Sequence, residues 1–569
     1  MVKETYNLWR EKATLDPDLI PELVAIENDE DLISDAFYTD LEFGTAGLRG
    51  VIGAGTNRMN VYTVGKASQG LAAYVNSISK NGKIAIAYDS RIKSDLFAKC
   101  AAEIFAANGI KVYIYNELMP TPMLSYAVRH LKCDAGIVIT ASHNPAKYNG
   151  YKAYDSDGCQ LGPDAAKYVL SIMNSVDTFS GIKSMDFEDG LKSGIIEYIG
   201  NDVINAYLDE VQKRRVSPNL DISNLNVIYT PLHGTGNKPV RNILKRIGVT
   251  DVTVVTEQEL PDGNFPTAPY PNPEIRQAFE CALKLADTVK PDILLATDPD
   301  ADRVGIAVNY NGEYRLFSGN DVGALLLNYI LDRRTANGTL PKNPVAVKTI
   351  VTTEICRKIA DNYSCELRDV LTGFKFIGEQ ILRLENVGEE ERYVFGFEES
   401  YGYLAGGYVR DKDAVVASML ICEMTAYYKA LGKTLVDVLD DLYKKFGYYY
   451  CAQKSFACEG QSGMKKIAGI MQSLRESSPA EINGSKVINI KDYSTSVSTD
   501  CTNGTTETID LPKSNVIAFG LENGASLIVR PSGTEPKIKI YVNAVGTTAD
   551  EAEANRASLI EAGTSLLGF

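Results

Sequence analysis

The stretch Lys83-Ile84-Ala85-Ile86-Ala87-Tyr88 is a short apolar run, which predicts a buried β-strand. Segments with helical patterns lie on both sides of it, and further strands are predicted at residues 112–115 and 136–139. Strands separated by single helices indicate crossover connections, so we expect an α/β fold with a mixed or mainly parallel sheet. The helical patterns are carried by Val64, Ala67, Leu71 and Val75 before the strand and by about residues 95–107 after it.

The same alternation of strands and helices starts twice more along the chain. The last part differs, because its strands follow one another without helices between them. This pattern predicts a C-terminal α+β domain with an antiparallel sheet, closed by a helix from about Asp550. The strands expected in the two repeats are residues 227–230, 252–255, 293–296, 345–348 and 393–395, and those of the last part are 516–519, 526–529 and 538–541.

A chain of 569 residues is too long for one compact core, and its length favours three or four domains. Changes in the pattern place boundaries near residues 200, 320 and 450. The expected domains are therefore residues 1–200, 201–320, 321–450 and 451–569. The proline-rich stretch 261–273 is interpreted as an extended surface loop inside the second domain.

The composition is that of an ordinary globular protein, with 45% hydrophobic and 23% charged residues. Its net charge of −15 disfavours nonspecific binding to nucleic acid or to an anionic membrane, because both require a basic surface. The ten cysteines form no C-x-x-C pair, which argues against a zinc ribbon or a redox dithiol. With no signal peptide and no long apolar run, we expect a soluble cytoplasmic protein. The sequence leaves the oligomeric state open.

Ser142 lies in the run Thr140-Ala141-Ser142-His143-Asn144-Pro145, directly after the strand at 136–139. A hydroxyl at the end of a buried strand is well placed to carry a covalent group during catalysis, although a plain turn after a strand has the same pattern. His143 can orient this loop. Lys152 follows ten residues after the serine and is a candidate to contact phosphate or to move a proton.

Three carboxylates follow the strand at 293–296, in the run Asp298-Pro299-Asp300-Ala301-Asp302-Arg303. Carboxylates this close repel one another unless a cation neutralises them, and hard oxygen donors select Mg²⁺ or Ca²⁺. The run is not an EF-hand loop, because Arg303 stands where that loop requires glycine. It also resembles the D-x-D of phosphatases with an aspartate nucleophile, and a solvated acidic turn is the remaining alternative.

A third polar loop, Glu398-Glu399-Ser400-Tyr401-Gly402, follows the strand at 393–395. Its carboxylates and hydroxyl can hydrogen-bond to sugar hydroxyls, but the pattern by itself favours a plain acidic turn. The run Thr372-Gly373-Phe374-Lys375 lies just upstream and can add a cation to the same site.

A fourth loop, Arg530-Pro531-Ser532-Gly533-Thr534-Glu535-Pro536, connects two strands of the last domain. Arg530 offers a planar set of donors, the hydroxyls add more, and Gly533 allows backbone N–H groups to approach an anion. The loop is therefore predicted to bind phosphate rather than to form a plain hairpin turn.

Together and in this order, the four loops resemble those of the α-D-phosphohexomutase superfamily, and the likeness covers essentially the whole chain. Residues 41–50 and 57–60 resemble the branch that holds bacterial α-phosphoglucomutases and animal phosphopentomutase-like enzymes. The resemblance implies four domains around a central cleft, the first three with a similar α/β core. Phe397 departs from the family, which frequently has glycine before the paired glutamates, and residues 146–150 differ from the glycine-rich version of animal phosphoglucomutases.

The resemblance also implies roles for individual residues. Ser142 would be phosphorylated and would share Mg²⁺ with the three aspartates, while Arg49, Lys152 and His143 would serve catalysis. The implied metal ligands are Ser142, Asp298, Asp300 and Asp302, and the implied substrate contacts are Arg303, Thr372, Lys375, Glu398, Ser400, Arg530, Ser532, Gly533, Thr534 and Lys539.

The implied reaction is the reversible interconversion of glucose 1-phosphate and glucose 6-phosphate through phosphoserine and a glucose 1,6-bisphosphate intermediate. The expected partner is thus a small sugar phosphate. A sister mutase for mannose or pentose phosphates, a phosphohydrolase that uses Asp298 as nucleophile, and a non-catalytic sugar-phosphate-binding protein remain as alternatives.

Overall fold

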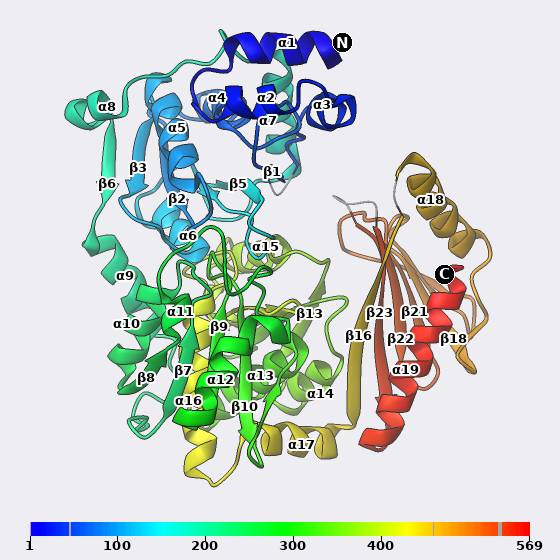
Figure 1. The fold of residues 1–569 in the computed structure, drawn as a ribbon. Coiled ribbons are helices and arrows are strands. Elements are labelled where there is room, and N and C mark those ends of the chain that lie inside the picture. The colour runs from blue at the N-terminus through cyan, green and yellow to red at the C-terminus, as the bar shows by residue number, and fades with distance from the viewer. Residues whose placement is uncertain (1, 45–46, 459, 533–536) are drawn as a thin grey trace. The chain divides into compact units, whose positions relative to one another are not determined.

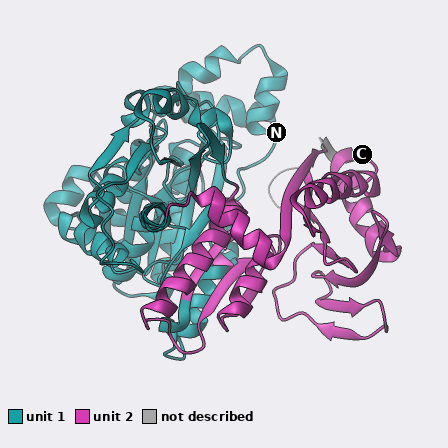
Figure 2. Ribbon diagram, turned by 90° about the horizontal axis from the view of Figure 1, so that it is seen from below, with its two compact units in different colours: residues 1–317, 377–393, 401–431 teal, residues 318–376, 394–400, 432–569 magenta. Residues whose placement is uncertain are grey.

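The computed structural model describes residues 2–44, 47–458, 460–532 and 537–569. The chain forms two compact units, and it passes from one to the other repeatedly, so neither unit is a continuous segment (Figure 2). Unit 1 comprises residues 1–317, 377–393 and 401–431, and unit 2 comprises residues 318–376, 394–400 and 432–569.

The first sheet of unit 1 has the strand order β1-β5-β4-β2-β3-β6 (Figure 1). Strands β4, β2, β3 and β6 are parallel, whereas β5 is antiparallel to both of its neighbours. The strand predicted at residues 83–88 is confirmed with the same bounds. The strands are β1 (Leu48–Val51), β2 (Lys83–Tyr88), β3 (Lys111–Tyr115), β4 (Ala135–Ile139), β5 (Tyr148–Asp155) and β6 (Ile196–Ile199).

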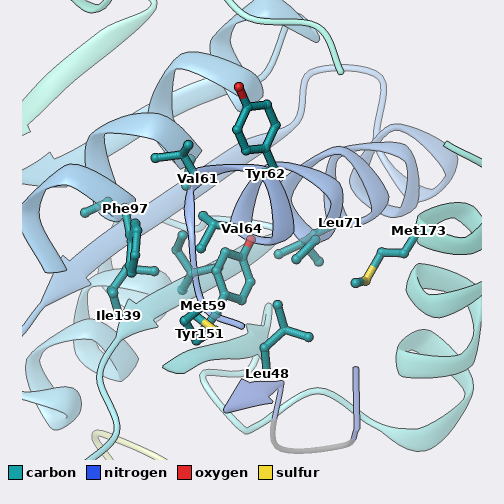
Figure 3. Packing of buried hydrophobic residues seen from close by; sticks show 14 of the residues in the cluster. Leu48, Met59, Val61, Tyr62, Val64, Leu71, Phe97, Ile139, Tyr151 and Met173 are labelled. Carbon is teal, nitrogen blue, oxygen red and sulfur yellow. The ribbon is translucent and has the colours of Figure 1, made fainter. Parts of the chain in front are cut away.

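Helix α4 packs its apolar side into the core of this sheet (Figure 3). Asn60 caps the helix, because its side chain accepts hydrogen bonds from the N–H groups of Tyr62 and Thr63. The four residues predicted at helical spacing, Val64, Ala67, Leu71 and Val75, are fully buried, which confirms that pattern. The helices of this part are α4 (Val61–Ile78), α5 (Ser94–Ala107), α6 (Thr121–His130), α7 (Pro163–Ser175) and α8 (Phe187–Ser193).

Three N-terminal helices, which the sequence analysis did not predict, precede this sheet: α1 (Val2–Lys12), α2 (Leu19–Ala25) and α3 (Glu30–Phe37). Trp9 on α1 makes edge-on ring contacts with Phe37, Tyr62 and Phe179 at centroid distances of 5.8, 5.3 and 5.6 Å. Aromatic pairs of this geometry add to the energy of burial. The helices are thus part of the core of unit 1.

The second sheet of unit 1 has the order β11-β10-β9-β7-β8, with β9, β7 and β8 parallel and β10 and β11 antiparallel. The interpretation of residues 261–273 as a surface loop is wrong in part, because Phe265 and Ala268 turn inward and are buried. The elements here are α9 (Asn201–Gln212), β7 (Asn226–Thr230), α10 (Asn237–Ile247), β8 (Asp251–Val254), α11 (Thr256–Glu259), α12 (Glu280–Val289), β9 (Ile293–Thr297), β10 (Val304–Tyr310), β11 (Glu313–Leu316) and α16 (Ala414–Ala430). Unit 1 also contains β15 (Gly402–Leu404), which is not a strand of this sheet.

Unit 2 begins with another α/β portion, in which β12 lies between β13 and β14 and runs parallel to β13. Its strands are preceded and followed by helices, as in unit 1. The elements are α13 (Gly319–Ala336), β12 (Val345–Thr349), α14 (Ile355–Asn362), β13 (Glu366–Val370), β14 (Tyr393–Glu398) and α17 (Leu435–Phe446). Helix α15 (Phe374–Glu385) begins in unit 2, but from residue 377 it belongs to unit 1.

The rest of unit 2 is an antiparallel sheet in the order β16-β23-β22-β21-β18-β19-β20, with α19 against β23 (Figure 1). Leu527, Val529 and Ile540 form part of its buried core. The elements are β16 (Tyr448–Ala457), α18 (Gly460–Glu476), β17 (Glu481–Ile482), β18 (Ser485–Asp492), β19 (Val497–Asp500), β20 (Thr506–Thr508), β21 (Ile517–Leu521), β22 (Ser526–Pro531), β23 (Lys537–Gly546) and α19 (Ala549–Leu566).

Mixed α/β sheets followed by an antiparallel sheet confirm the fold class expected from the sequence. Among the described residues no single helix is long and apolar enough to cross a membrane, and only α16 and α17, taken together as a bent pair, meet the criteria of length and composition.

Candidate active site

The serine loop begins where the fully buried strand β4 ends. Ser142 is 3% exposed and has a left-handed backbone conformation, with φ of 52°. This conformation is uncommon for a residue with a side chain and points to a functional constraint. The Ser142 N–H donates to Thr140 Oγ1 at 2.8 Å, and Ser142 Oγ donates to Asp298 Oδ2 at 2.7 Å. The serine hydroxyl is therefore directed at the aspartate loop.

The aspartate loop connects β9 to β10, and its three carboxylates are at most 1% exposed. Asp298 Oδ1 holds the turn by accepting the N–H groups of Asp302 and Arg303 at 3.1 and 3.0 Å. One carboxylate oxygen from each of Asp298, Asp300 and Asp302 lies within 4.8 Å of the other two. Burial, and then the neighbouring carboxylates Asp300 and Asp302, raise the pKa of Asp298 well above its usual value. The loop thus concentrates negative charge away from water.

The donor set of this cluster fits a divalent metal ion. Asp300 Oδ1 and Asp302 Oδ1 are buried and have no hydrogen-bond partner among the described residues. A buried carboxylate oxygen without a partner is costly, and coordination of a cation removes that cost. Hard oxygen ligands suit Mg²⁺ or Ca²⁺ rather than softer metals. The three aspartates together can therefore hold such an ion.

Two buried lysines contact the same carboxylates. Lys152 extends from β5, and its Nζ lies 2.7 Å from Asp300 Oδ2 and 3.4 Å from Asp302 Oδ2. Burial alone would lower the pKa of Lys152, but Asp300 and Asp302 outweigh it and the net shift is upward. Lys412 Nζ lies 3.1 Å from Asp302 Oδ2 and 3.0 Å from Asp411 Oδ1. Lys152 is thus held as an ammonium group beside the aspartates, and Lys412 forms ion pairs with Asp302 and Asp411.

The sequence analysis missed Lys412 and Asp411, although a signal was present. The run Arg410-Asp411-Lys412-Asp413 is charged throughout, stands directly before the apolar helix α16, and is buried over its whole length. Charged residues are rarely buried unless they are paired, so four in succession before a core helix indicate a site. Gly402 leaves room for Lys412, because a Cβ there would lie 2.1 Å from Lys412 Cδ.

Further positive charge surrounds His143, whose Nδ1 lies 3.3 Å from Ser142 Oγ. Burial, followed by the charges of Arg303 and Arg49, lowers the pKa of His143 well below its usual value. The imidazole is consequently neutral at pH 7. Arg303 itself forms an ion pair with Glu274 at 2.6 Å, and Arg49 is exposed on β1. Unit 1 thus brings together all the catalytic and metal-ligating residues named from the sequence.

Unit 2 carries the remaining candidates. Glu398, at the end of β14, is 7% exposed, and its Oε1 accepts the N–H of Gly373 at 2.8 Å. The neighbouring Glu399 accepts the hydroxyl of Thr349 at 3.0 Å. The backbone next to Thr372 is thereby attached to the glutamate loop. Ser400 and Lys375 are partly exposed next to these anchored residues.

The strand before the predicted phosphate loop lies close to the glutamate loop within unit 2. Burial and the charge of Glu399 raise the pKa of Tyr541 to about 12, against the lowering effect of Arg530, which hydrogen-bonds to this tyrosine. Lys539 is paired with Arg530 across β22 and β23. The Ser532 N–H donates to the Lys537 carbonyl at 2.8 Å. Gly533 and Thr534 lie outside the described residues.

Phe397, which stands where the family frequently has glycine, packs against a glycine of helix α13. The ring of Phe397 is 1% exposed and packs over Gly323, where a Cβ would lie 2.0 Å from Phe397 Cε2. Phe397 also stacks on Phe395, with centroids 5.5 Å apart. The phenylalanine and the glycine therefore form a matched pair directly beside Glu398.

We expect Gly323→Ala to destabilise unit 2 by about 1–3 kcal/mol, because the new methyl group displaces a buried ring. Thermal unfolding measures the effect. Gly469→Ala on α18 is the matched control, since a Cβ there meets nothing within 4 Å and alanine favours a helix. Equal unfolding midpoints for the two variants would show that the Phe397 ring does not require Gly323.

Family comparisons agree with this arrangement. Four family descriptions match in sequence along the chain: phosphoglucomutase/phosphomannomutase α/β/α domain I at residues 40–179, domain II at 205–312, domain III at 318–446, and the C-terminal domain at 476–561. The chain belongs to the phosphoglucomutase/phosphomannomutase family and has its four-domain architecture. It is thus an enzyme of the phosphotransferase and isomerase type.

Individual relatives support the same assignment. A protein of Staphylococcus saprophyticus named phosphoglucomutase is 37% identical over 545 residues, which cover 96% of this chain and 97% of the relative. Two solved structures share the fold. Parafusin, a phosphoglucomutase from Paramecium in an open form, has a TM-score of 0.69 and 18% identity over 93% of this chain and 95% of its own. The N-acetylphosphoglucosamine mutase of Aspergillus fumigatus, in complex with GlcNAc-6P and magnesium, has a TM-score of 0.51 and 13% identity over 93% and 96%.

Proposed function

We propose that the protein interconverts α-D-glucose 1-phosphate and glucose 6-phosphate through a phosphoserine at Ser142 and bound glucose 1,6-bisphosphate. The observation that carries this proposal is the 2.7 Å contact between Ser142 Oγ and a buried carboxylate cluster, two of whose oxygens have no hydrogen-bond partner in the described part of the chain. A serine in that position is suited to hold a phosphoryl group next to a cation. The name of the staphylococcal relative favours glucose as the sugar.

We assign the metal ion as Mg²⁺, held by Asp298, Asp300, Asp302 and an oxygen of phosphorylated Ser142. The oxygen-only donor set suits this ion, and magnesium is present in the Aspergillus structure. When bound, the ion offsets negative charge on the phosphoryl group that is transferred. No residue of the chain other than these four is assigned to the metal.

The chain's own groups perform the transfer. The phosphoryl group leaves Ser142 Oγ as its P–O bond breaks, and a new P–O bond forms to the free hydroxyl of the sugar monophosphate. Lys152, held as an ammonium, supplies the proton that Ser142 Oγ gains, and the proton released by the sugar hydroxyl restores it. Arg49 and neutral His143 support the serine loop electrostatically. The reverse transfer from the other phosphate of the bisphosphate completes the cycle.

The residues of unit 2 are assigned to binding. Glu398 and Ser400 contact sugar hydroxyls, with Thr372 and Lys375 beside them, and polar contacts of this kind can accept the sugar in both of its orientations. Arg530, Ser532, Gly533, Thr534 and Lys539 form the site for the phosphate that is not transferred, since they combine cationic and hydrogen-bond donors. Arg303 adds a substrate contact on the side of the aspartates.

The same mechanism serves a phosphomannomutase or a phosphopentomutase, so the test compares sugars. The 1-phosphates of glucose, mannose and ribose are supplied side by side, and kcat/KM is measured while intact mass and peptide mapping locate the phosphoryl group. We expect glucose 1-phosphate to be converted most efficiently and the phosphoryl group to be on Ser142. A preference for mannose or ribose phosphate would move the assignment to a sister mutase, and the absence of phosphoserine during turnover would contradict the mechanism.

A further inference from the structure

Arg91, in the loop between β2 and α5, contacts the serine loop at several points, although it was not among the residues named from the sequence. The side chain of Arg91 is fully buried. Its Nη1 donates to the carbonyl oxygens of Pro145 and Tyr148 at 3.0 and 2.9 Å, and its Nη2 donates to those of Ser142 and Asn144. One guanidinium group thus holds three carbonyls of the segment that connects β4 to β5 and the carbonyl of Tyr148, the first residue of β5.

These bonds bear directly on the direction of the Ser142 hydroxyl. The segment has few backbone hydrogen bonds of its own, such as Asn144 N–H to the Ala141 carbonyl at 3.2 Å. Ser142 adopts its left-handed conformation only if the surrounding structure enforces it. The bond from Arg91 to the Ser142 carbonyl fixes the rotation of that peptide unit, and with it the direction of the Cα–Cβ bond.

Arg91 is itself held on its other edge. Asp89 Oδ2 lies 3.3 Å from Arg91 Nε, and both side chains have no exposed surface. Asp89 Oδ1 accepts the Arg91 N–H at 2.9 Å and the Ser94 hydroxyl at 2.7 Å. A buried ion pair with these extra hydrogen bonds has a fixed geometry, which a flexible surface pair does not have.

The proline-rich loop supplies the remaining support. The Phe265 ring, fully buried, lies under the guanidinium with its centroid 5.0 Å from Arg91 Cζ, a cation–π arrangement. Gly263 allows the loop to approach closely, because a Cβ there would lie 2.5 Å from the Ile92 nitrogen. Residues 261–273 therefore help to hold Arg91 in place, a role that was not expected of a surface loop.

We propose that Arg91 is a positioning residue for phosphoryl transfer, which keeps Ser142 Oγ directed at Asp298 while the phosphoryl group leaves and returns. This inference rests on the proposed function. The role requires the planar fork of arginine, because a lysine ammonium is a point donor and cannot reach four carbonyls in a fixed plane. Misplacement of the serine by as little as 1 Å costs on the order of a hundredfold in rate.

The test is Arg91→Lys, which keeps the charge and removes the fork. We expect kcat to fall about a hundredfold with KM changed less than about threefold, since none of the residues whose carbonyls Arg91 holds is assigned to substrate binding. The matched control is Arg215→Lys, at a partly buried arginine that pairs with the buried Glu423 at 2.7 Å and donates to the Ser217 carbonyl. The control variant should lose thermal stability to a similar extent and keep its kcat.

A fall in kcat no larger than that of Arg215→Lys, or a fall in KM and kcat together, would overturn the positioning role. Activity retained in Ser142→Ala would instead refute the proposed function, which separates the two failures. If Arg91→Lys does not fold, Asp89→Asn tests the same point, because it keeps Arg91 and neutralises its partner. There we expect kcat to fall about tenfold at unchanged KM, and an unchanged kcat would overturn the inference.

Discussion

Replacement of Ser142 by alanine is expected to lower kcat for glucose 1-phosphate by about 10⁴-fold or more, to the background of the assay. The Ser142 oxygen carries the phosphoryl group in the proposed cycle. Among the described residues, one other hydroxyl donates to the aspartate cluster, that of Thr121, which contacts Asp300 at 2.8 Å. A coupled glucose 6-phosphate assay measures the rate. Intact mass measures the loss of the phosphorylated species.

The matched control is Ser68→Ala, at a fully buried serine of α4 that hydrogen-bonds to Tyr151. It should retain both activity and the phosphorylated species. Undiminished turnover in Ser142→Ala would contradict the phosphoserine mechanism and would favour a hydrolase that uses Asp298 as nucleophile. Such an enzyme would also release inorganic phosphate, which a second assay detects.

The second large effect is expected for Asp298→Asn and for removal of metal. The amide retains an oxygen that can accept the N–H groups of Asp302 and Arg303, so the turn is preserved while one negative charge is lost. We expect kcat to fall about a thousandfold, because the lost charge weakens metal binding and its stabilisation of the transition state. Treatment of the native protein with a chelator should have the same effect and should be reversed by Mg²⁺.

Stability provides a readout that does not depend on turnover. Ligand present at a hundred times its Kd stabilises the folded state by about 2.7 kcal/mol, so Mg²⁺ should raise the Tm of the native protein and not that of Asp298→Asn. Asp155→Asn is the control, because its carboxylate also accepts N–H groups of a turn, from Asp157 and Cys159, away from the aspartate cluster. A Tm of the native protein that does not respond to Mg²⁺ would contradict the metal site.

The sequence predicted secondary structure best where the elements are marked by a local pattern of apolar residues. The strand at residues 83–88 follows from a continuous apolar run, whose four central residues are all buried. Helix α4 follows from apolar residues at helical spacing, and these residues are buried. About half of the strands were not predicted, among them β5 and β16. In β5, Lys152 interrupts the apolar pattern because the site buries it. The first half of β16 is partly buried and its second half is mostly exposed, so the strand has no continuous apolar face.

The candidate site was predicted where one loop carries several functional groups, as at residues 298–303. It was missed where single residues from distant segments converge. Arg91 and Lys412 are separated from the loops they contact by many residues, and only the folded chain brings Arg91 to the Ser142 carbonyl and Lys412 to Asp302. The need for glycine at position 323 likewise cannot be predicted from the sequence, because it arises from the contact with the Phe397 ring in the folded chain.

The way in which the chain alternates between the two units has a practical consequence for dissecting the enzyme. Because each unit is assembled from three separate stretches of polypeptide, one proteolytic cut cannot liberate either of them whole. Any recombinant fragment bounded by two positions will either mix the units or leave part of one behind. Truncated versions will therefore expose surfaces that are interior in the intact molecule, and a loss of solubility in such fragments would reflect severed packing rather than a defect in catalysis.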